Sequence, residues 1–318
     1  MMGTCIEQEL AMTVAHMPRL TAMKKQISTD PEMFGLLQDS TALLNDPVAL
    51  RACMAAEGYL YLKGVLNTET IADAHQIMAE RLAERGHTDP AYPIQDCIAA
   101  PSSKVQFMPD LSQDNAPLHD VLYDGAMIRI FEVLLDAPVR HFDFTWVRAV
   151  APKRGTPPHM DIVYMGRGTK QLYTAWTPMC DIPISMGGLL VLERSHLHQR
   201  LNDGYGSKDV DEFCENKVGS EYEEMGGGGN IRPGGWLSDN PVKLRKALGG
   251  RWLTADFAAG DVLIFSVYTV HTSLDNASNR IRISTDTRYQ RADEPIDERW
   301  IGEHPIGHGK AGKRGKIC

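Results

Sequence analysis

The chain has 318 residues, of which 43% are hydrophobic and 23% are charged, and its formal net charge at pH 7 is -8. This composition is typical of a globular protein, and the length is ample for a sizeable core. The negative charge argues against a nucleic-acid partner or an anionic membrane surface, and no apolar run is long enough to cross a bilayer. The six cysteines show no CxxC spacing, and the N-terminus lacks a secretory pattern. We therefore expect a cytoplasmic protein with reduced thiols.

Helical patterns dominate the first part of the chain. We expect residues 1–57 to form a helical N-terminal extension, followed by a short strand over 58–62. A helix is then predicted from the N-cap Asn67 to the C′ glycine Gly86. A second amphipathic helix is predicted over residues 118–135.

From residue 139 onward the pattern changes to short strands separated by turns. The predicted strands span 141–150, 172–179, 188–192, 252–257, 262–267 and 280–289. Strands do not alternate with helices here, which favours a barrel or jelly roll over a parallel sheet. The predicted fold class is mainly β with flanking helices (α+β), as a single domain over 1–318. Its core would be a double-stranded β-helix of the jelly-roll or cupin-like type, with a helical N-terminal part.

Two segments depart from this pattern. Residues 201–250 form a long polar insertion with a run of four glycines, Gly226 to Gly229, and a single large anchor, Trp236. A loop of this length inside a compact domain is usually either functional or disordered. We predict a lid that closes over the site when substrate binds. Residues 305–318 are predicted to form a basic tail.

The first candidate site is a His-x-Asp pair, His159 and Asp161, on an extended segment. Side chains two residues apart on such a segment project to the same side, so both can reach one metal ion. His271, from a distant strand, would complete a three-ligand face. Two histidines and one carboxylate with open positions are typical of non-haem Fe(II) sites. Taken alone the pair is a weak signal, since a histidine near an aspartate is more often an ordinary polar contact.

A candidate carboxylate-binding residue follows on the next apolar strand. Arg282 lies eleven residues after His271, and its guanidinium offers a rigid fork of donors. Arg280 is the rival for this role because it shares the strand parity of Arg282. We expect Arg288 to be a surface or rim charge. Ordinary structural or surface contacts are expected for His141, His196 and His198.

These residues, with several further motifs, resemble the phytanoyl-CoA hydroxylase family of Fe(II)/2-oxoglutarate dioxygenases over roughly residues 58–289. The further motifs are Gly58-Tyr59, Lys104-Val105-Gln106, Gly187-Gly188-Leu189-Leu190-Val191, Ser195-His196 and Gly260-Asp261. The resemblance implies that His159, Asp161 and His271 hold iron. One departure is Met160, which stands between the two ligands where the family often has glutamine.

The resemblance also implies how the co-substrate binds. Arg282 would hold the distal carboxylate of 2-oxoglutarate, with Ser273 beside it, and Lys104 and Trp176 match family positions that touch the co-substrate. The spacing from the distal histidine in the family selects Arg282 over Arg280.

The implied reaction is hydroxylation of an unactivated C–H bond of a small-molecule substrate. It would consume O2 and 2-oxoglutarate, release succinate and CO2, and be stimulated by ascorbate. A carboxylate at Asp161, where related halogenases have a small residue, argues for hydroxylation or a desaturase or cyclase variant. The competing interpretations are a non-catalytic jelly-roll protein that binds a small ligand or metal, and a cupin-like metalloenzyme without 2-oxoglutarate.

The identity of the substrate is left open by the sequence. Tyr164, Arg167 and Trp236 are candidate pocket residues, the first two because they closely follow the His-x-Asp pair. Residues up to about 45 fall outside the resemblance and would either cover the site or form a homodimer contact.

Overall fold

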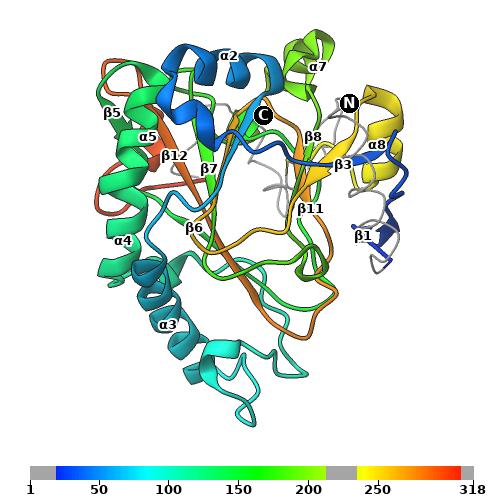
Figure 1. Ribbon diagram of the computed structural model, residues 1–318, viewed down its shortest axis with the longest axis vertical. Helices are drawn as coiled ribbons and strands as arrows, with labels where there is room; N and C mark the ends of the chain where they lie inside the picture. Colours follow the sequence, from blue (N-terminus) through cyan, green and yellow to red (C-terminus); the bar gives the residue numbers. More distant parts are fainter. Residues whose placement is uncertain (1–18, 213–234, 309–318) are drawn as a thin grey trace.

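Two β-sheets and a layer of helices make up the molecule (Figure 1). The computed structural model describes residues 19–212 and 235–308. The two sheets face each other around a shared apolar cluster, in which Trp176 and Phe265 of one sheet pack with Val191 and Leu253 of the other. This is the two-sheet jelly-roll arrangement that the strand pattern predicts.

The larger sheet is antiparallel throughout and has the order β4-β10-β7-β12-β5, with β6 pairing β12 as well. Its strands are β4 (Tyr59–Leu62), β5 (Val139–His141), β6 (Trp146–Val150), β7 (Tyr173–Pro178), β10 (Val262–Ser266) and β12 (Arg282–Arg291). The long strand β12 pairs with β5, β6 and β7, and so has more partners than any other strand of this sheet.

The smaller sheet has the order β11-β8-β9-β3. Its strands are β3 (Phe34–Leu36), β8 (Leu189–Leu192), β9 (Trp252–Thr254) and β11 (His271–Ser273). Only the β3–β9 pairing is parallel among the pairings within this sheet. A separate hairpin joins β1 (Thr21–Ala22) to β2 (Lys25–Gln26).

Helices cover the outer face of the larger sheet, along the left side and the top of the view in Figure 1. They are α2 (Pro47–Glu57), α3 (Thr68–Glu84), α4 (Ala116–Tyr123) and α5 (Gly125–Leu135). Their apolar sides and the outward side chains of the sheet form one buried cluster. The predicted caps are confirmed for α3, because the Asn67 side chain accepts from the Thr70 amide at 2.9 Å and Gly86 follows with φ +70°.

Three further helices flank the interior: α6 (Ile162–Met165), α7 (Gln199–Gly204) and α8 (Pro241–Leu248). The last two lie in or beside the predicted insertion, so that segment is partly helical. The four-glycine run lies outside the described residues, and the lid stays a prediction. No helix within 19–212 or 235–308 has the length and apolar character needed to cross a membrane.

The helical interpretation of the N-terminal part is wrong over residues 19–36. That stretch forms β1, β2 and β3, and only α2 and the 3-10 turn Thr41–Asn45 are helical among the described residues before Gly58. Strand β3 pairs with β9, more than two hundred residues later, so it is an integral edge of the smaller sheet. Its three residues are too few to show a period.

The single helix predicted over 118–135 is two helices. Asp124 ends α4 and caps α5, with its carboxylate accepting from the Gly125 amide at 2.6 Å. Gly125 has φ +52°, a conformation that glycine adopts readily. The Asp-Gly pair is a turn signal that outweighs the amphipathic pattern here.

Candidate metal centre and co-substrate site

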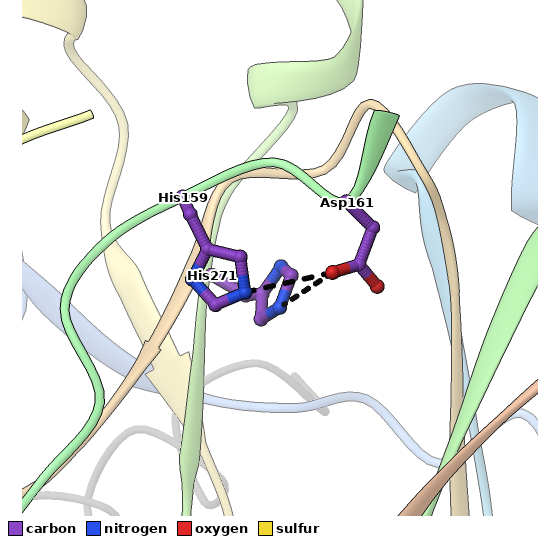
Figure 2. Close-up of side chains that lie close together, drawn as sticks. All are labelled: His159, Asp161 and His271. Carbon is purple, nitrogen blue, oxygen red and sulfur yellow. Dashed lines mark ion pairs between the residues drawn. The ribbon is translucent and has the colours of Figure 1, made fainter. Parts of the chain in front are cut away.

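Three side chains from two segments far apart in the sequence converge between the sheets (Figure 2). His159 and Asp161 lie on one segment, with Asp161 as the N-cap residue of α6, and His271 starts β11. Reciprocal backbone hydrogen bonds of 3.0 Å join His159 to His271 and fix their relative position. The Asp161 Oδ1 atom lies 3.5 Å from His159 Nε2 and 3.7 Å from His271 Nε2. All three residues are buried, and one ligand atom from each lies within 4.8 Å of the others.

Both imidazoles are held in the tautomer that a metal requires. His159 Nδ1 lies 2.8 Å from the Pro157 carbonyl oxygen, and His271 Nδ1 lies 3.0 Å from that of Thr269. A carbonyl oxygen can only accept, so each Nδ1 carries the proton and each Nε2 lone pair faces the cluster. Burial, with the nearby His159, lowers the pKa of His271 to about 4 and keeps it neutral.

The two oxygens of the Asp161 carboxylate have different partners. Its Oδ2 atom accepts from Thr174 Oγ1 at 2.6 Å and from Arg288 Nη2 at 2.8 Å. Burial alone would raise its pKa, but the Arg288 guanidinium holds that pKa well below its usual range. Asp161 is therefore an anion whose other oxygen, Oδ1, is left toward the histidines.

The interpretation of Arg288 as a surface or rim charge is wrong. Only 2% of it is exposed, it forms the ion pair with Asp161, and its guanidinium lies 4.1 Å from the Trp146 ring centre. Strand parity explains the burial, since Arg288 shares a face of β12 with Arg282 and Asp286. The partner that keeps it inside is 127 residues away in sequence and invisible to local pattern.

Arg282 is buried, and one edge of its guanidinium has no acceptor among the described residues. Its Nη1 donates to the Gly187 carbonyl oxygen at 2.6 Å, whereas Nε and Nη2 have no partner in the described parts of the chain. Burial and the nearby Arg148 lower the pKa of Arg282 to about 10, which still leaves it charged at neutral pH. Nε and Nη2 form the side edge of a guanidinium, the edge that takes a carboxylate in a bidentate pair.

The rival Arg280 lies outside β12 and is partly exposed, and its Nε donates to the Asp96 carbonyl oxygen at 2.8 Å. Nothing in this position directs it toward the histidines. The geometry therefore favours Arg282, as the spacing predicts.

The other candidate co-substrate residues divide into two groups. Trp176 is fully buried opposite Asp286, and its indole Nε1 has no partner among the described residues. Ser273 follows His271 on β11, and its Oγ accepts from the Thr156 amide at 2.8 Å. Lys104 is exposed on the loop before the turn Pro109–Ser112, so the structure gives it no place in the buried cluster.

The candidate substrate residues also separate. The Tyr164 ring lies edge-on to His159, with 5.7 Å between ring centres, and is half-buried beside the cluster. Arg167 forms an ion pair with Asp209, so its charge is already matched. Trp236 is half-buried, and the amide of the next residue, Leu237, donates to the Pro158 carbonyl oxygen at 2.8 Å. That bond brings the end of the insertion against the metal-binding loop.

The three histidines for which structural or surface contacts are predicted make such contacts. His141 packs against Tyr123, the His196 ring fills the space over Gly58, and His198 caps α7. Met160, at the position where the family often has glutamine, is fully buried in an apolar cluster.

Sequence reasoning missed Thr174 and the charges around Arg282. Arg148 Nε donates to Asp286 Oδ2 at 2.6 Å on the inner face of the larger sheet. One sequence signal could have predicted the inner-face charges. Every second residue of β12 from Arg282 to Gln290 is polar, whereas Ile283 and Tyr289 lie on the other face, in the cluster under the helices.

Comparison with known proteins gives the same class. The model of the phytanoyl-CoA dioxygenase (PhyH) family matches residues 54–284. The 1-deoxypentalenic acid 11-beta-hydroxylase of Streptomyces exfoliatus is 29% identical over 270 residues, which cover 80% of this chain and 84% of that protein. The enzyme of the same name from Streptomyces arenae is 27% identical over 278 residues, covering 82% and 87%.

Solved structures share the fold. The epimerase SnoN from nogalamycin biosynthesis, in complex with Fe3+, alpha ketoglutarate and nogalamycin RO, has a TM-score of 0.52 at 19% identity, covering 79% of this chain and 87% of its own. EctD from S. alaskensis in its apoform has a TM-score of 0.52 at 14% identity, covering 92% and 93%. The jelly-roll, cupin-like core predicted from the strand pattern is confirmed.

Fold, buried His-Asp-His cluster and family match together define a non-haem iron, 2-oxoglutarate-dependent oxygenase. The chain belongs to the phytanoyl-CoA dioxygenase family.

Proposed function

We propose that His159, Asp161 and His271 bind Fe(II), that Arg282 binds 2-oxoglutarate, and that the enzyme hydroxylates a C–H bond of a small molecule. The observation that supports this most strongly is that one structure contains both a set of candidate metal ligands and a buried arginine with unmatched N–H groups. Two Nε2 lone pairs and one carboxylate oxygen face a common point, and the buried Arg282 guanidinium on the inner face of the larger sheet has a bidentate edge that no described residue accepts.

The donor set fits the metal. Two neutral imidazoles and one carboxylate suit Fe(II) and leave coordination positions open. The carbonyl groups of Pro157 and Thr269 orient the rings, and Thr174 and Arg288 orient the carboxylate. Outer partners of this kind usually matter nearly as much as the ligands.

The co-substrate fits the arginine. A buried guanidinium with free N–H groups is costly unless an acceptor occupies them. The distal carboxylate of 2-oxoglutarate would accept from Nε and Nη2 of Arg282. The Trp176 indole N–H, which has no partner among the described residues, is a further donor on the same wall. Arg282 then orients the co-substrate toward the iron, and the apolar walls around Trp176 and Phe257 exclude water.

When bound, Fe(II) and 2-oxoglutarate would supply activation of O2, with release of succinate and CO2, and ascorbate would keep the iron reduced. Because a carboxylate occupies the position of Asp161, we propose hydroxylation as the outcome. The substrate is proposed to be a small organic molecule, with Tyr164 and Trp236 at its pocket. The relatives named for 1-deoxypentalenic acid make that acid the first compound to test.

The test is succinate release from 2-oxoglutarate in the presence of Fe(II) and ascorbate, across a panel of small molecules that includes 1-deoxypentalenic acid. An active compound should raise succinate formation and gain one oxygen atom by mass spectrometry. Gain of a double bond or ring instead would indicate a desaturase or cyclase. If iron and 2-oxoglutarate fail to bind at all, the chain is a non-catalytic jelly-roll protein.

A further inference from the structure

We propose that the substrate carries a carboxylate and that Arg288 binds it beside the metal centre. This inference rests on the proposed function and adds the chemical class of the substrate and the residue that recognises it. It is supported by N–H groups of Arg288 that no described residue accepts, and by the balance of charge around the His159–Asp161–His271 cluster.

Arg288, like Arg282, is a buried guanidinium with N–H groups that no described residue accepts, although its free atoms do not form a single bidentate edge. Its Nη2 donates to Asp161, but Nε and Nη1 have no partner in the described parts of the chain and are shielded from solvent. The stacking on Trp146 fixes the plane of the guanidinium. A buried charged donor without an acceptor is destabilising, so a bound anion that accepts from Arg288 would stabilise the site.

The charges on the inner wall call for one more anion. Arg148, Arg282 and Arg288 line the inner face of the larger sheet, whereas the acidic groups paired with them are Asp161 and Asp286. Bound Fe(II) and the dianion of 2-oxoglutarate would cancel each other. One positive charge is then left over in a buried site, and a substrate with one negative charge would neutralise it.

Arg288 is the cation with free capacity. Arg148 is matched by Asp286, and the proposed function commits the free edge of Arg282 to the co-substrate. Arg299 is buried in a separate cluster, where it pairs with Asp209, Asp211 and Asp297. Since Arg288 contacts a proposed iron ligand directly, a carboxylate bound to it would hold the rest of that molecule close to the open coordination positions.

The experiment compares small carboxylic acids with their methyl esters, using the Fe(II)-loaded chain of residues 1–318. Succinate release and oxygenated product are measured for each pair, with the wild type and with Arg288→Lys. This variant keeps a positive charge toward Asp161 but has no N–H groups at the positions of Nε and Nη1. We expect the wild type to prefer acids by about 30-fold or more in kcat/KM, and the variant to raise the KM for acids by a similar factor. Arg291→Lys, on the same strand in an exposed pair with Asp293, is the matched control and should leave that KM unchanged.

The Fe(II)–2-oxoglutarate charge-transfer band, recorded anaerobically in every variant, separates the possible failures. Absence of the band in the wild type would overturn the proposed function and this inference with it. A normal band with equal use of acids and esters, or with no acid used, would overturn the inference alone. So would an Arg288→Lys variant with unchanged KM for acids, or one that loses 2-oxoglutarate affinity instead, because Arg288 would then serve the co-substrate. The acid–ester comparison in the wild type stands even if the variant fails to fold.

Discussion

The two faces of strand β12 differ in how well other residues of the protein match their buried side chains. On the outer face, Tyr289 stacks on Phe131 with 4.1 Å between ring centres, and Ile283 is fully buried under the helices. On the inner face, Arg282 and Arg288 are equally buried but keep N–H groups that no described residue accepts. The outer face is closed mostly by apolar side chains, although the Thr285 hydroxyl has no partner among the described residues. The inner face differs in that the groups left partly unmatched there are charged guanidinium groups.

This difference separates residues that stabilise the fold from residues that serve the site, although they alternate along one strand. Changes on the inner face should remove binding or activity with little loss of stability. Changes on the outer face should do the reverse. Ligands that fill the inner face should also raise the free energy of unfolding, because they bind only the folded state.

The largest effect is expected for the inner cluster itself. His271→Ala should abolish turnover and iron binding while the apo-protein unfolds at a similar denaturant concentration, since three ligands leave no redundancy for a labile metal. Iron content after reconstitution and urea unfolding would be measured together. His119→Ala, exposed on α4, is the control and should keep both properties. Normal turnover by His271→Ala would refute the metal assignment.

The next effect concerns the co-substrate. Arg282→Ala should weaken 2-oxoglutarate binding by about 2–5 kcal/mol, or roughly 30- to several-thousand-fold, because a buried bidentate pair is lost. Arg280→Ala should bind normally, as Arg280 bonds to a backbone carbonyl away from the cluster. Anaerobic titration of the charge-transfer band compares the two variants. The reverse result would mean that the spacing from His271 selects the wrong arginine.

A change on the outer face, at the residue next to Arg282, should affect stability and not binding. Ile283→Ala should lower the free energy of unfolding by about 2–5 kcal/mol, since it leaves a cavity under the helices. The folded fraction should keep its affinity for 2-oxoglutarate. Urea unfolding and the same titration measure both quantities. A loss of affinity without a loss of stability would show that the two faces are not separate.

A smaller effect is expected for the hydrogen bond to the carboxylate. Thr174→Val removes the donor to Asp161 Oδ2 and should weaken iron binding by about 10–100-fold. Thr177→Val is the matched control on the same strand, because the Thr177 hydroxyl is buried on the other face without a partner in the described chain. Competition with a chelator measures both. Equal iron affinity in the two variants would remove Thr174 from the support of the metal.

Much of the site could be predicted because it depends on short spacings. The His-x-Asp pair, the later histidine and the arginine eleven residues beyond it are local signals, and the structure brings the three predicted ligands together. Arg288 could not be placed with equal ease, because its burial depends on Asp161 and Trp146, both far away in sequence. The strand β3 could not be predicted for the same reason, since it is extended because it pairs with β9, which is far away in sequence. The division into a single domain and the homodimer contact stay predictions.

The most direct test of the account is anaerobic titration of the apo-enzyme with Fe(II) and then 2-oxoglutarate. The account predicts one iron per chain and a charge-transfer band that appears only when both are present, with the band weakened in Arg282→Ala and absent in His271→Ala. Iron binding that survives in His271→Ala, or a band unaffected by loss of Arg282, would contradict it.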